Sequence, residues 1–451
     1  MDTKFHVRVI DQIPDPQILA RRIAHLPGAV LLSSRTKDPC AYLSCEPIET
    51  RVGLDPEPSV RIGALPPTIG GFPRWIGLLP YEAFRGHERR ARNSSQDDRP
   101  EPLVTTPRWW RYGAIAEVTN EVKIIGDDPE CVRILAERLQ TDAAEPSQIR
   151  FELKPGTEQA VHHERRIISA LSHIADGDVY QVNLARRIDL VVRGHALDWL
   201  EHMGSIAPAS FGFALEVGDL RIAGTSPELC LAVSPNGRLL TRPIKGTRPR
   251  GASRTEDEEL ILQLATDPKE IAELSMVIDL ERNDLSRVST LGSIQVLSDG
   301  VVETFGTVHH RVASVVSRLR PEVTRSELLN AFMPSGSVTG TPKIRAMELI
   351  ASLEQSRRGL YTGAYGWIGH DGSLRLGMAI RTVVANRSGE GVYFAGGGIV
   401  ADSIPKLEVE ETEWKALQIF RNSFGSASGV APPRSEQRPS CAGWSFAGDP
   451  D

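Results

Sequence analysis

The stretch Thr241-Arg-Pro-Ile-Lys-Gly-Thr-Arg-Pro-Arg-Gly251 places a single lysine, Lys245, among three arginines. Like charges repel, and such crowding lowers the pKa of an ammonium group below the value of about 10.4 that is typical of lysine. The neutral amine is the form that attacks an electrophile, so the crowding would favour chemistry at Lys245. The alternative is a solvated basic loop, and this stretch alone does not decide between the two.

The composition is that of a globular protein with a large core, because 40% of the 451 residues are hydrophobic and 24% are charged. A formal net charge of −6 argues against a nucleic-acid-binding protein. The five cysteines are scattered, which favours a reducing compartment. The N-terminus lacks an apolar signal core, and no apolar run approaches the roughly 20 residues of a membrane span. We therefore expect a cytoplasmic protein that does not enter the membrane.

The pattern along the chain changes at two places. Residues 1–140 indicate an N-terminal region of short strands and helices, and residues 141–155 read as a connection. From 155 to 424 the pattern is denser, with long helices alternating with strands. The tail, residues 426–451, is rich in Ser, Gly and Pro, and we expect it to be disordered.

Two helical segments carry paired carboxylates. Asp267 and Pro268 are suited to cap and begin a helix on which Glu270 and Glu273 share a face that continues into Val277 and Leu280. A second pair, Glu408 and Glu411, follows Pro405 and heads a stripe that runs on to Trp414 and Leu417. Acids in a first helical turn can simply be solvated, where the helix dipole favours them. Recurrence of the pair on an apolar face instead indicates a cation, and an all-oxygen ligand set suits Mg²⁺.

Three glycine-containing sites are candidate anion cradles, although each could equally be an ordinary turn. In Ser335-Gly-Ser-Val-Thr-Gly-Thr-Pro-Lys343, Thr341 could cap a helix that begins at Pro342 and presents free N–H groups. Ala395-Gly-Gly-Gly-Ile-Val400 follows an expected strand, and its glycines would let the backbone approach a ligand. It also matches the dinucleotide pattern Gly-x-Gly-x-x-Ala, weakly, because an acidic helix follows. The third site is the Lys245 stretch itself.

Two further residues are candidates for ligand contact. Leu374 to Val384 alternates as one strand, with small residues beside Arg381 that leave room for an anion. A solvent-facing arginine on an edge strand is an equal alternative. His309 and His310 lie in a second expected strand, where a histidine is more often structural than catalytic.

Together these segments resemble the chorismate-utilising enzymes, a family that includes anthranilate synthase component I, aminodeoxychorismate synthase component I, isochorismate synthase and salicylate synthase. The resemblance is strong over about residues 155–424 and weaker before them. The motifs that carry it are Ser226-Pro-Glu-Leu, Pro243-Ile-Lys-Gly-Thr, Lys269-Glu-Ile-Ala-Glu with Asp279-Leu-Glu-Arg-Asn-Asp, Gly336-Ser-Val-Thr-Gly-Thr-Pro-Lys, and Gly398-Ile-Val-Ala-Asp-Ser with Glu408-Val-Glu-Glu-Thr.

The resemblance implies an α+β fold like that of anthranilate synthase component I, with layers of antiparallel sheets and flanking helices around one chorismate site. It implies that Glu273 and Glu411 bind Mg²⁺, assisted by Glu270 and Glu408. It also implies that Glu228 is the general acid for the departing C4 hydroxyl and that His310 lies near the substrate side chain. The substrate-binding residues that it implies are Tyr361, Arg381, Gly397, Gly398, Thr247 and Lys415.

Two positions divide the family. Isochorismate and salicylate synthases activate water with a lysine where this chain has Gln181. Anthranilate synthases lack the lysine of Pro-Ile-Lys-Gly-Thr, whereas aminodeoxychorismate synthases have it. The resemblance is therefore closest to aminodeoxychorismate synthase component I, in which Lys245 would attack C2 and ammonia would then attack C4. The product would lead to 4-aminobenzoate, for folate biosynthesis or for a secondary metabolite.

The resemblance also sets expectations about partners and alternatives. The chain carries no glutaminase motif, so we expect ammonia to come from a glutamine amidotransferase subunit, component II. Leu31-Leu-Ser-Ser replaces the Leu-Leu-Glu-Ser that the family links to tryptophan feedback, and Phe305-Gly-Thr-Val-His-His departs from the usual segment around the histidine. The alternatives are anthranilate synthase component I and a nicotinamide-dependent oxidoreductase using Ala395-Gly-Gly-Gly.

Overall fold

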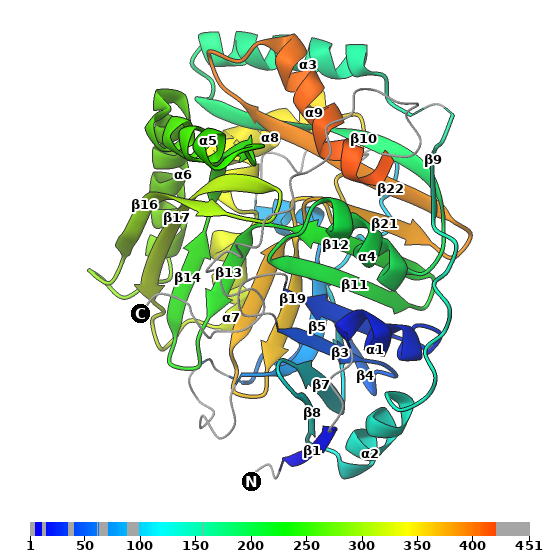
Figure 1. Cartoon of the computed structure of the whole chain (residues 1–451). Coiled ribbons are helices and arrows are strands. Elements are labelled where there is room, and N and C mark those ends of the chain that lie inside the picture. The colour runs from blue at the N-terminus through cyan, green and yellow to red at the C-terminus, as the bar shows by residue number, and fades with distance from the viewer. Residues whose placement is uncertain are drawn as a thin grey trace.

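Two large antiparallel sheets form the centre of the computed structural model of this chain (Figure 1). The structure describes residues 5–10, 15–34, 40–60, 62, 71–87, 99–155 and 157–420. The expected disordered tail, residues 426–451, lies outside the described residues, as do residues 421–424 of the expected catalytic region. No helix in the described ranges is long and apolar enough to cross a membrane.

The larger sheet has 12 strands among the described residues. Its order is β1 (His6–Ile10), β8 (Val122–Gly126), β7 (Ala114–Val118), β3 (Ala41–Ser44), β2 (Ala29–Ser33), β11 (Phe211–Val217), β12 (Leu220–Ser226), β21 (Thr382–Asn386), β22 (Glu390–Ile399), β10 (Gln181–Arg193) and β18 (Gly340–Thr341). Strand β9 (Arg150–Leu153) pairs with β10 outside this path. The segment 141–155, expected as a connection, therefore contributes a strand to the sheet.

The second sheet has 10 strands in the described part of the chain. Its order is β15 (Ile244–Pro249), β17 (Val308–Arg318), β14 (Arg238–Arg242), β13 (Leu229–Val233), β20 (Leu374–Met378), β19 (Ala364–Gly369), β5 (Pro73–Leu79), β6 (Arg108–Arg111) and β4 (Glu49–Val52), with β16 (Gln295–Thr304) paired to β17. Both sheets combine strands from before residue 140 with strands from after residue 155.

The chain passes from one sheet to the other inside the segment expected as a single strand, so that expectation is wrong. Strand β20 ends at Met378 in the 10-stranded sheet, and β21 begins at Thr382 in the 12-stranded sheet. Arg381 lies at the crossing with φ of +50°, a backbone conformation that is uncommon for residues other than glycine. The alternation in the sequence cannot reveal this break, because apolar side chains recur at every second residue both before and after it.

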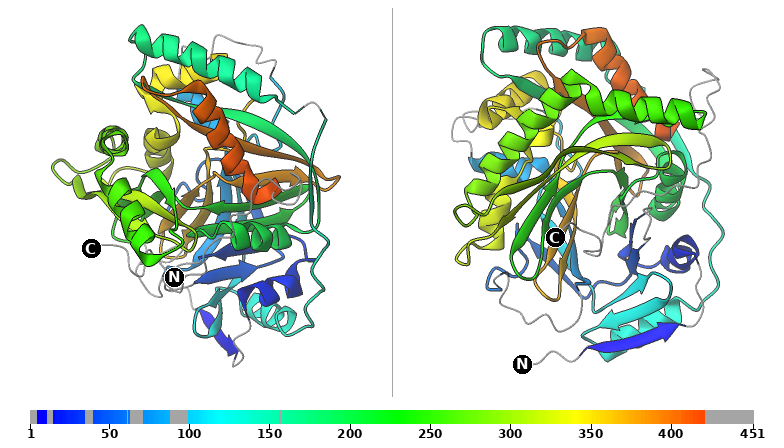
Figure 2. Two further views of the ribbon diagram at one scale, coloured as in Figure 1. Left: turned by 45° about the horizontal axis from the view of Figure 1, so that its top comes forward. Right: turned by 60° about the vertical axis from the view of Figure 1, so that its left-hand side comes forward.

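Helices cover the outer faces of the two sheets. They are α1 (Pro16–Ile23), α2 (Pro129–Arg138), α3 (Ala160–Ala175), α4 (Ala196–Ile206), α5 (Arg254–Thr266), α6 (Pro268–Ser286), α7 (Arg325–Phe332), α8 (Lys343–Leu353) and α9 (Pro405–Phe420), with short 3₁₀ turns η1 (Tyr81–His87) and η3 (Gly336–Val338). The N-terminus of α6 is as expected, because Asp267 accepts hydrogen bonds from the amides of Lys269 and Glu270 and Pro268 is the first helical residue. Figure 2 shows α3 and α9 side by side in both views.

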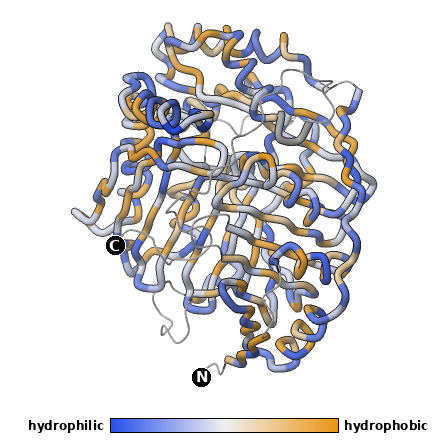
Figure 3. The backbone as a smooth tube through the Cα atoms, viewed as in Figure 1, coloured by the Kyte–Doolittle hydropathy of each residue, from blue (hydrophilic) through white to orange (hydrophobic). Residues whose placement is uncertain are grey.

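The main core lies between the two sheets. It joins apolar side chains of the 12-stranded sheet, such as Leu32 and Phe213, to those of the 10-stranded sheet, such as Ile76 and Trp367. Separate clusters pack α1, α2 and α4 against one sheet and α6 and α7 against the other. Hydrophobic residues accordingly run along the strands in the middle of the molecule (Figure 3). The result is the α+β layered architecture that the motifs predicted.

Candidate active site

The triple glycine lies within strand β22, not in a loop after it. Gly396, Gly397 and Gly398 pair with Ala185, Leu184 and Asn183 of β10. A dinucleotide fingerprint needs a turn between a strand and a helix, so the nicotinamide interpretation of this segment is wrong. A Cβ on Gly398 would lie 2.8 Å from Nε2 of Gln181 and 3.4 Å from Nζ of Lys245, so the ends of these two side chains lie against this glycine.

Lys245 lies on β15 and points toward this glycine strand. Its Nζ is 3.5 Å from the backbone oxygen of Ser337 in η3. A register shift in the pairing of β15 with β17 separates Lys245 from Thr247, and the residue between them, Gly246, has φ of +79°. This irregularity changes the direction of the chain, as β-bulges commonly do beside functional sites.

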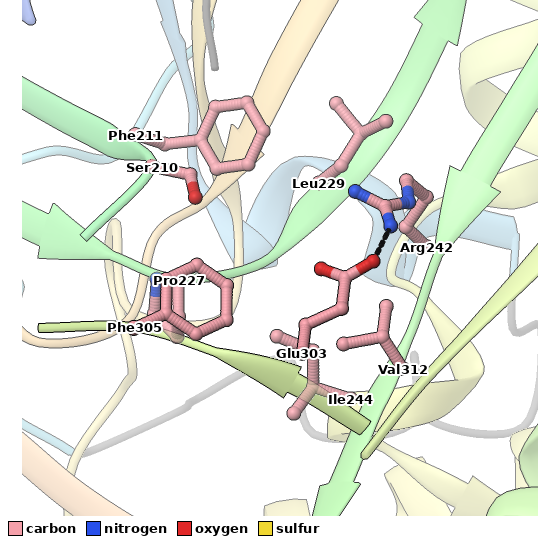
Figure 4. Close-up of a pocket in the computed structure, with 9 residues that line it drawn as sticks. All are labelled: Ser210, Phe211, Pro227, Leu229, Arg242, Ile244, Glu303, Phe305 and Val312. Atoms are coloured by element: carbon pink, nitrogen blue, oxygen red, sulfur yellow. Dashed lines mark hydrogen bonds and ion pairs between the residues drawn. The ribbon is translucent and has the colours of Figure 1, made fainter. Parts of the chain in front are cut away.

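The three arginines near Lys245 in the sequence are each paired with an acid in the structure. Arg242 pairs with Glu303 in a separate small pocket that Phe211, Ile244 and Phe305 help to line (Figure 4). The other two pairs are Arg248 with Asp267 and Glu270, and Arg250 with Asp257.

Cationic crowding around Lys245 is therefore the wrong explanation for its chemistry. The Lys245 ammonium instead acts electrostatically on three carboxyl groups from three segments, Glu228, Glu273 and Glu411. These carboxyl groups, the backbone of Ser337 and the glycine strand together define the surroundings of the amine.

The paired carboxylates of α6 and α9 converge on the same site. A Cβ on Gly397 would lie 3.4 Å from Oε2 of Glu408 and 3.5 Å from Oε2 of Glu411, and one on Gly246 would lie 2.8 Å from Oε2 of Glu270. Burial raises the pKa of both Glu273 and Glu408, and neighbouring acids add to the effect. Carboxyl groups gathered in this way favour a cation among them.

The apolar face expected on α9 is only partly correct. Glu408, Val409 and Thr412 are buried, but Trp414 is 71% exposed. The side chain of Leu417 lies outside the described residues. On α6 the expected face is confirmed at Val277, which is buried, whereas Leu280 is only half-buried.

The four glutamates fit Mg²⁺ in the chemistry of their donor atoms, since they offer oxygen ligands alone. Across the described ranges, however, no group of three His, Cys, Asp or Glu side chains is close enough to enclose an ion. Mg²⁺ is commonly held by one or two carboxylates, with water and substrate oxygens completing its shell. Glu273 and Glu411 would hold it in that way, with Glu270 and Glu408 beside them.

Glu228 lies in the short link between β12 and β13 and is 5% exposed. Burial raises its pKa to about 7, although the Ser337 hydroxyl, Lys245 and Arg381 act in the opposite direction. Oγ of Ser337 donates a hydrogen bond of 2.6 Å to Oε1 of Glu228. A carboxyl group with a pKa near neutrality can hold a proton and release it to a leaving group.

Of the expected anion-binding residues, Arg381 lies near this carboxyl group and Lys415 lies near Glu411. Arg381 acts electrostatically on Glu228 and on His310. Tyr361 is buried and stacks on Phe394, with ring centroids 5.2 Å apart. Lys415 donates a hydrogen bond of 2.9 Å to the oxygen of Gly396 and also pairs with Glu411.

His310 is buried on β17, where its Nδ1 lies 2.9 Å from Oγ1 of Thr247 and its ring meets Phe305 edge-on. Burial and the nearby Arg381 lower the pKa of His310 to about 3. The imidazole is therefore neutral at physiological pH, which suits hydrogen bonding and not the binding of an anion through charge.

The anion cradle predicted at Ser335–Lys343 differs in the structure from the expected helix N-terminus. Thr341 forms part of strand β18 with Gly340, and α8 begins at Lys343 after the N-cap residue Pro342. The expected cap by Thr341 is therefore wrong. The same segment serves the site through Ser335 and Ser337, because its 3₁₀ turn brings both hydroxyls toward Glu228.

Sequence reasoning missed several buried polar groups. The side-chain oxygen of Asn183 finds no hydrogen-bond partner within the described part of the chain, and Asn183 on β10 pairs with Gly398. The same holds for the side-chain oxygen of Gln181, which the sequence did single out. Arg358 is buried and hydrogen-bonded to Glu354, Thr362 and two backbone oxygens. Glu281, four residues after the recognised Val277, follows the same helical face and could have been found by that period.

Comparison with known proteins gives one family match. A model described as chorismate binding enzyme matches residues 46–421. The chain is 40% identical over 259 residues to anthranilate synthase component 1 of Pseudomonas putida, which covers 57% of this chain and 52% of that protein. It is 42% identical over 250 residues to aminodeoxychorismate synthase component 1 of Bacillus subtilis, covering 55% and 53%. The chain thus matches about half the length of each of these two relatives.

A solved structure extends the likeness over almost the whole chain. Anthranilate synthase component I from Streptococcus pneumoniae TIGR4 aligns with a TM-score of 0.69 and 26% sequence identity. The alignment covers 93% of this chain and 92% of that one. The layered arrangement of sheets and helices is therefore shared by proteins whose sequences differ at most positions.

Proposed function

Because this chain belongs to the chorismate binding enzyme family, we propose that it is component I of an aminodeoxychorismate synthase. In this role it converts chorismate and ammonia to 4-amino-4-deoxychorismate. The observation that carries the proposal is the position of Lys245. Its amine lies beside Gly398 and within electrostatic reach of Glu228, a buried carboxyl group whose pKa is raised to about 7.

The reaction proceeds through two displacements. The neutral amine of Lys245 attacks C2 of chorismate, and both ring double bonds shift, from C1=C2 and C5=C6 to C1=C6 and C4=C5. The C4–O bond breaks, the hydroxyl leaves as water with a proton from Glu228, and the new secondary ammonium releases its extra proton to solvent. Ammonia then attacks C4 and expels Lys245, which restores the amine and leaves nitrogen at C4. A covalent intermediate of this kind divides one difficult substitution into two easier ones.

The remaining residues bind and orient the substrate. Arg381 and Tyr361, with the backbone at Gly397 and Gly398, form the cradle for the side-chain carboxylate, and Lys415 adds a second cation. Mg²⁺, when bound by Glu273 and Glu411, neutralises the ring carboxylate. His310 and Thr247 present hydrogen-bonding groups on the neighbouring strands.

Ammonia is supplied by a partner in this proposal. The similar proteins named component 1 support an arrangement in which a second subunit, a glutamine amidotransferase, releases ammonia for this chain. The purified chain is expected to use ammonium salts. Efficient use of glutamine by the chain alone would contradict this division of labour.

Anthranilate synthase component I is the second candidate, and the names of similar proteins favour it. The relative from Pseudomonas putida and the Streptococcus pneumoniae structure both carry that name. In that reaction ammonia attacks C2 directly, and Lys245 would only contact or steer the substrate. The two candidates share the acid, the metal ligands and the anion cradle, so the product distinguishes them.

The deciding experiment is incubation of the purified chain with chorismate, Mg²⁺ and ammonium, followed by identification of the product. We expect 4-amino-4-deoxychorismate, and Lys245→Ala should reduce its formation by orders of magnitude because the covalent route is lost. Lys154→Ala, which removes an exposed lysine paired with Glu390, is the matched control. Fluorescent anthranilate as the main product of the unmodified chain would refute the first assignment in favour of the second.

A further inference from the structure

A chain of hydrogen bonds leads from Glu228 away from the expected substrate site. Oγ of Ser337 is 2.6 Å from Oε1 of Glu228, and the hydroxyls of Ser337 and Ser335 are 3.0 Å apart. Oγ of Ser335 is 3.0 Å from Oε1 of Glu281 on α6. All four side chains are buried, and Glu281 is 1% exposed.

The far end of this chain is closed by Thr241 of β14. Its Oγ1 lies 2.8 Å from Oε2 of Glu281 and 3.0 Å from the backbone oxygen of Cys230. Both oxygens of Glu281 are therefore held by hydroxyl groups and not by a cation. A buried carboxylate without a paired cation is costly, and protonation removes that cost.

Counting protons shows that the two carboxyl groups are linked. Three oxygen–oxygen contacts separate Glu228 from Glu281, and each needs one proton. The hydroxyls of Ser335 and Ser337 supply two, so the third must come from one of the carboxyl groups. If Glu228 supplies it, the hydrogen bonds run toward Glu281, and if Glu281 supplies it, they run toward Glu228.

We propose that Glu281 is a buried proton store that shares a proton with Glu228 through Ser335 and Ser337. Glu281 does not contact the reacting atoms in this scheme and is a positioning residue for the proton. The inference rests on the proposed function in one respect, because it assumes that Glu228 is the acid that protonates the leaving hydroxyl.

The proton transfer balances at every step. The transfer starts with a proton on each carboxyl group: the shared proton lies on Glu281, and Glu228 carries a second proton on its other oxygen. Glu228 gives that second proton to the C4 oxygen as the C4–O bond breaks, and water leaves. Glu228 then accepts a proton from Ser337, which accepts one from Ser335, which accepts one from Glu281. Three protons each move across one hydrogen bond, the negative charge passes from Glu228 to Glu281, and solvent replaces the lost proton after product release.

The surrounding charges are compatible with a shared proton. Glu228 faces Lys245 of β15 and Arg381 between the sheets, and both favour its ionised form. On its own helix Glu281 is near Asp284, which pairs with Lys343 of α8. The thiol of Cys230 on β13 lies near both carboxyl groups, and burial holds its pKa well above the usual range.

The two acidities are close enough for exchange. Burial raises the pKa of Glu228 to about 7, and burial together with the charge of Glu228 raises that of Glu281 to about 8. Two interacting carboxyl groups titrate as a pair. The proton that the pair loses last therefore stays available to Glu228 up to the higher of the two pKa values. Without Glu281, Glu228 should lose its proton at a pH near its own pKa.

The first test is the pH profile of kcat for chorismate conversion. Glu281→Gln and Ser335→Ala should each move the alkaline limb of this profile to lower pH, because Glu228 then lacks the second proton source. The matched control is Ser317→Ala, which removes another buried serine hydroxyl, bonded to Ser289. A loss of turnover that is equal at every pH, with the limb unmoved in both variants, would show a merely structural role and overturn the proposal.

The second test needs no substrate. Infrared spectra of the resting full chain count protonated carboxyl groups as pH rises, and thermal unfolding confirms that each variant folds. In the unmodified chain and in Ser317→Ala, we expect the carboxyl groups of Glu228 and Glu281 to titrate as a coupled pair. Glu281→Gln should abolish this coupled titration. Ser335→Ala should split it into two independent titrations. If the two carboxyl bands of the unmodified chain titrate independently, the two groups do not share a proton and the proposal is overturned. This readout stands whichever aminated product the chain makes, so failure of the proposed function remains distinguishable.

Discussion

Replacing Gly246 by alanine tests how the Lys245 strand is positioned. Gly246 occupies the irregularity between Lys245 and Thr247, with φ of +79°. A Cβ there would lie 2.7 Å from Cδ1 of Leu264 and 2.8 Å from Oε2 of Glu270. The substitution therefore strains the backbone and pushes on one of the carboxylates expected beside the metal.

The two costs can be separated by a matched control. A left-handed conformation costs an alanine about 1–2 kcal/mol, and overpacking typically adds about 1–3 kcal/mol. Gly177 has φ of +80° and nothing within 4 Å of its missing Cβ, so Gly177→Ala carries the first cost without the second. Gly246→Ala should lower the free energy of unfolding by about 2–5 kcal/mol in total.

Urea unfolding measures the stability of both variants, and chorismate turnover at a temperature where both are folded measures activity. Gly177→Ala should keep full turnover, whereas Gly246→Ala should lose at least about tenfold, since displacement of catalytic groups by about 1 Å commonly costs more than that. If the two variants lose equal stability and Gly246→Ala keeps full turnover, the contacts of Gly246 do not position the site.

Three further outcomes are expected. Glu273→Gln and Glu411→Gln should each weaken Mg²⁺ binding and turnover by about 10–100-fold or more, measured by calorimetry and product formation, while the exposed neighbour Glu410→Gln changes neither. Glu281 has a folded-state pKa of about 8, above its unfolded value of about 4.3, so its contribution to stability is full below about pH 4.3 and falls as pH rises to about 8. Glu281→Gln should therefore flatten the fall in melting temperature over that range, and an unchanged slope would contradict this sign. Arg358→Met should cost about 3–5 kcal/mol of stability because it leaves Glu354 buried and unpaired, and Glu354→Gln in the same chain should restore part of the loss seen in urea unfolding.

The fold could be predicted from motifs but not from local patterns. Alternation from Leu374 to Val384 indicated one strand, and the structure divides it between two sheets at Arg381. Both halves are buried, and a buried strand in either sheet shows the same period. Which sheet a strand joins depends on pairing partners that are distant in sequence, and no local rule supplies them.

The same limit applies to charges. Sequence proximity suggested that the arginines near Lys245 crowd it, but their acidic partners lie on other elements, such as Glu303 on β16 and Asp257 on α5. The carboxylate pairs were easier to predict from the sequence. The helical period places Glu270 beside Glu273 and Glu408 beside Glu411, independently of the rest of the fold. Patterns within one helix are therefore the more reliable guide to this site.

The site itself is divided between the two sheets, and this division explains why its chemistry depends on the whole core. Lys245 belongs to the 10-stranded sheet, whereas Gly398 and Gln181 belong to the 12-stranded sheet. Arg381 lies on the segment that crosses between them. The distance from the amine to the glycine strand is thus set by how the two sheets pack, through side chains such as Phe213 and Trp367 that touch no substrate in the proposed scheme. Since close-packed interiors transmit small changes of volume, the geometry of the proposed nucleophile is a property of that shared core as much as of the Lys245 strand.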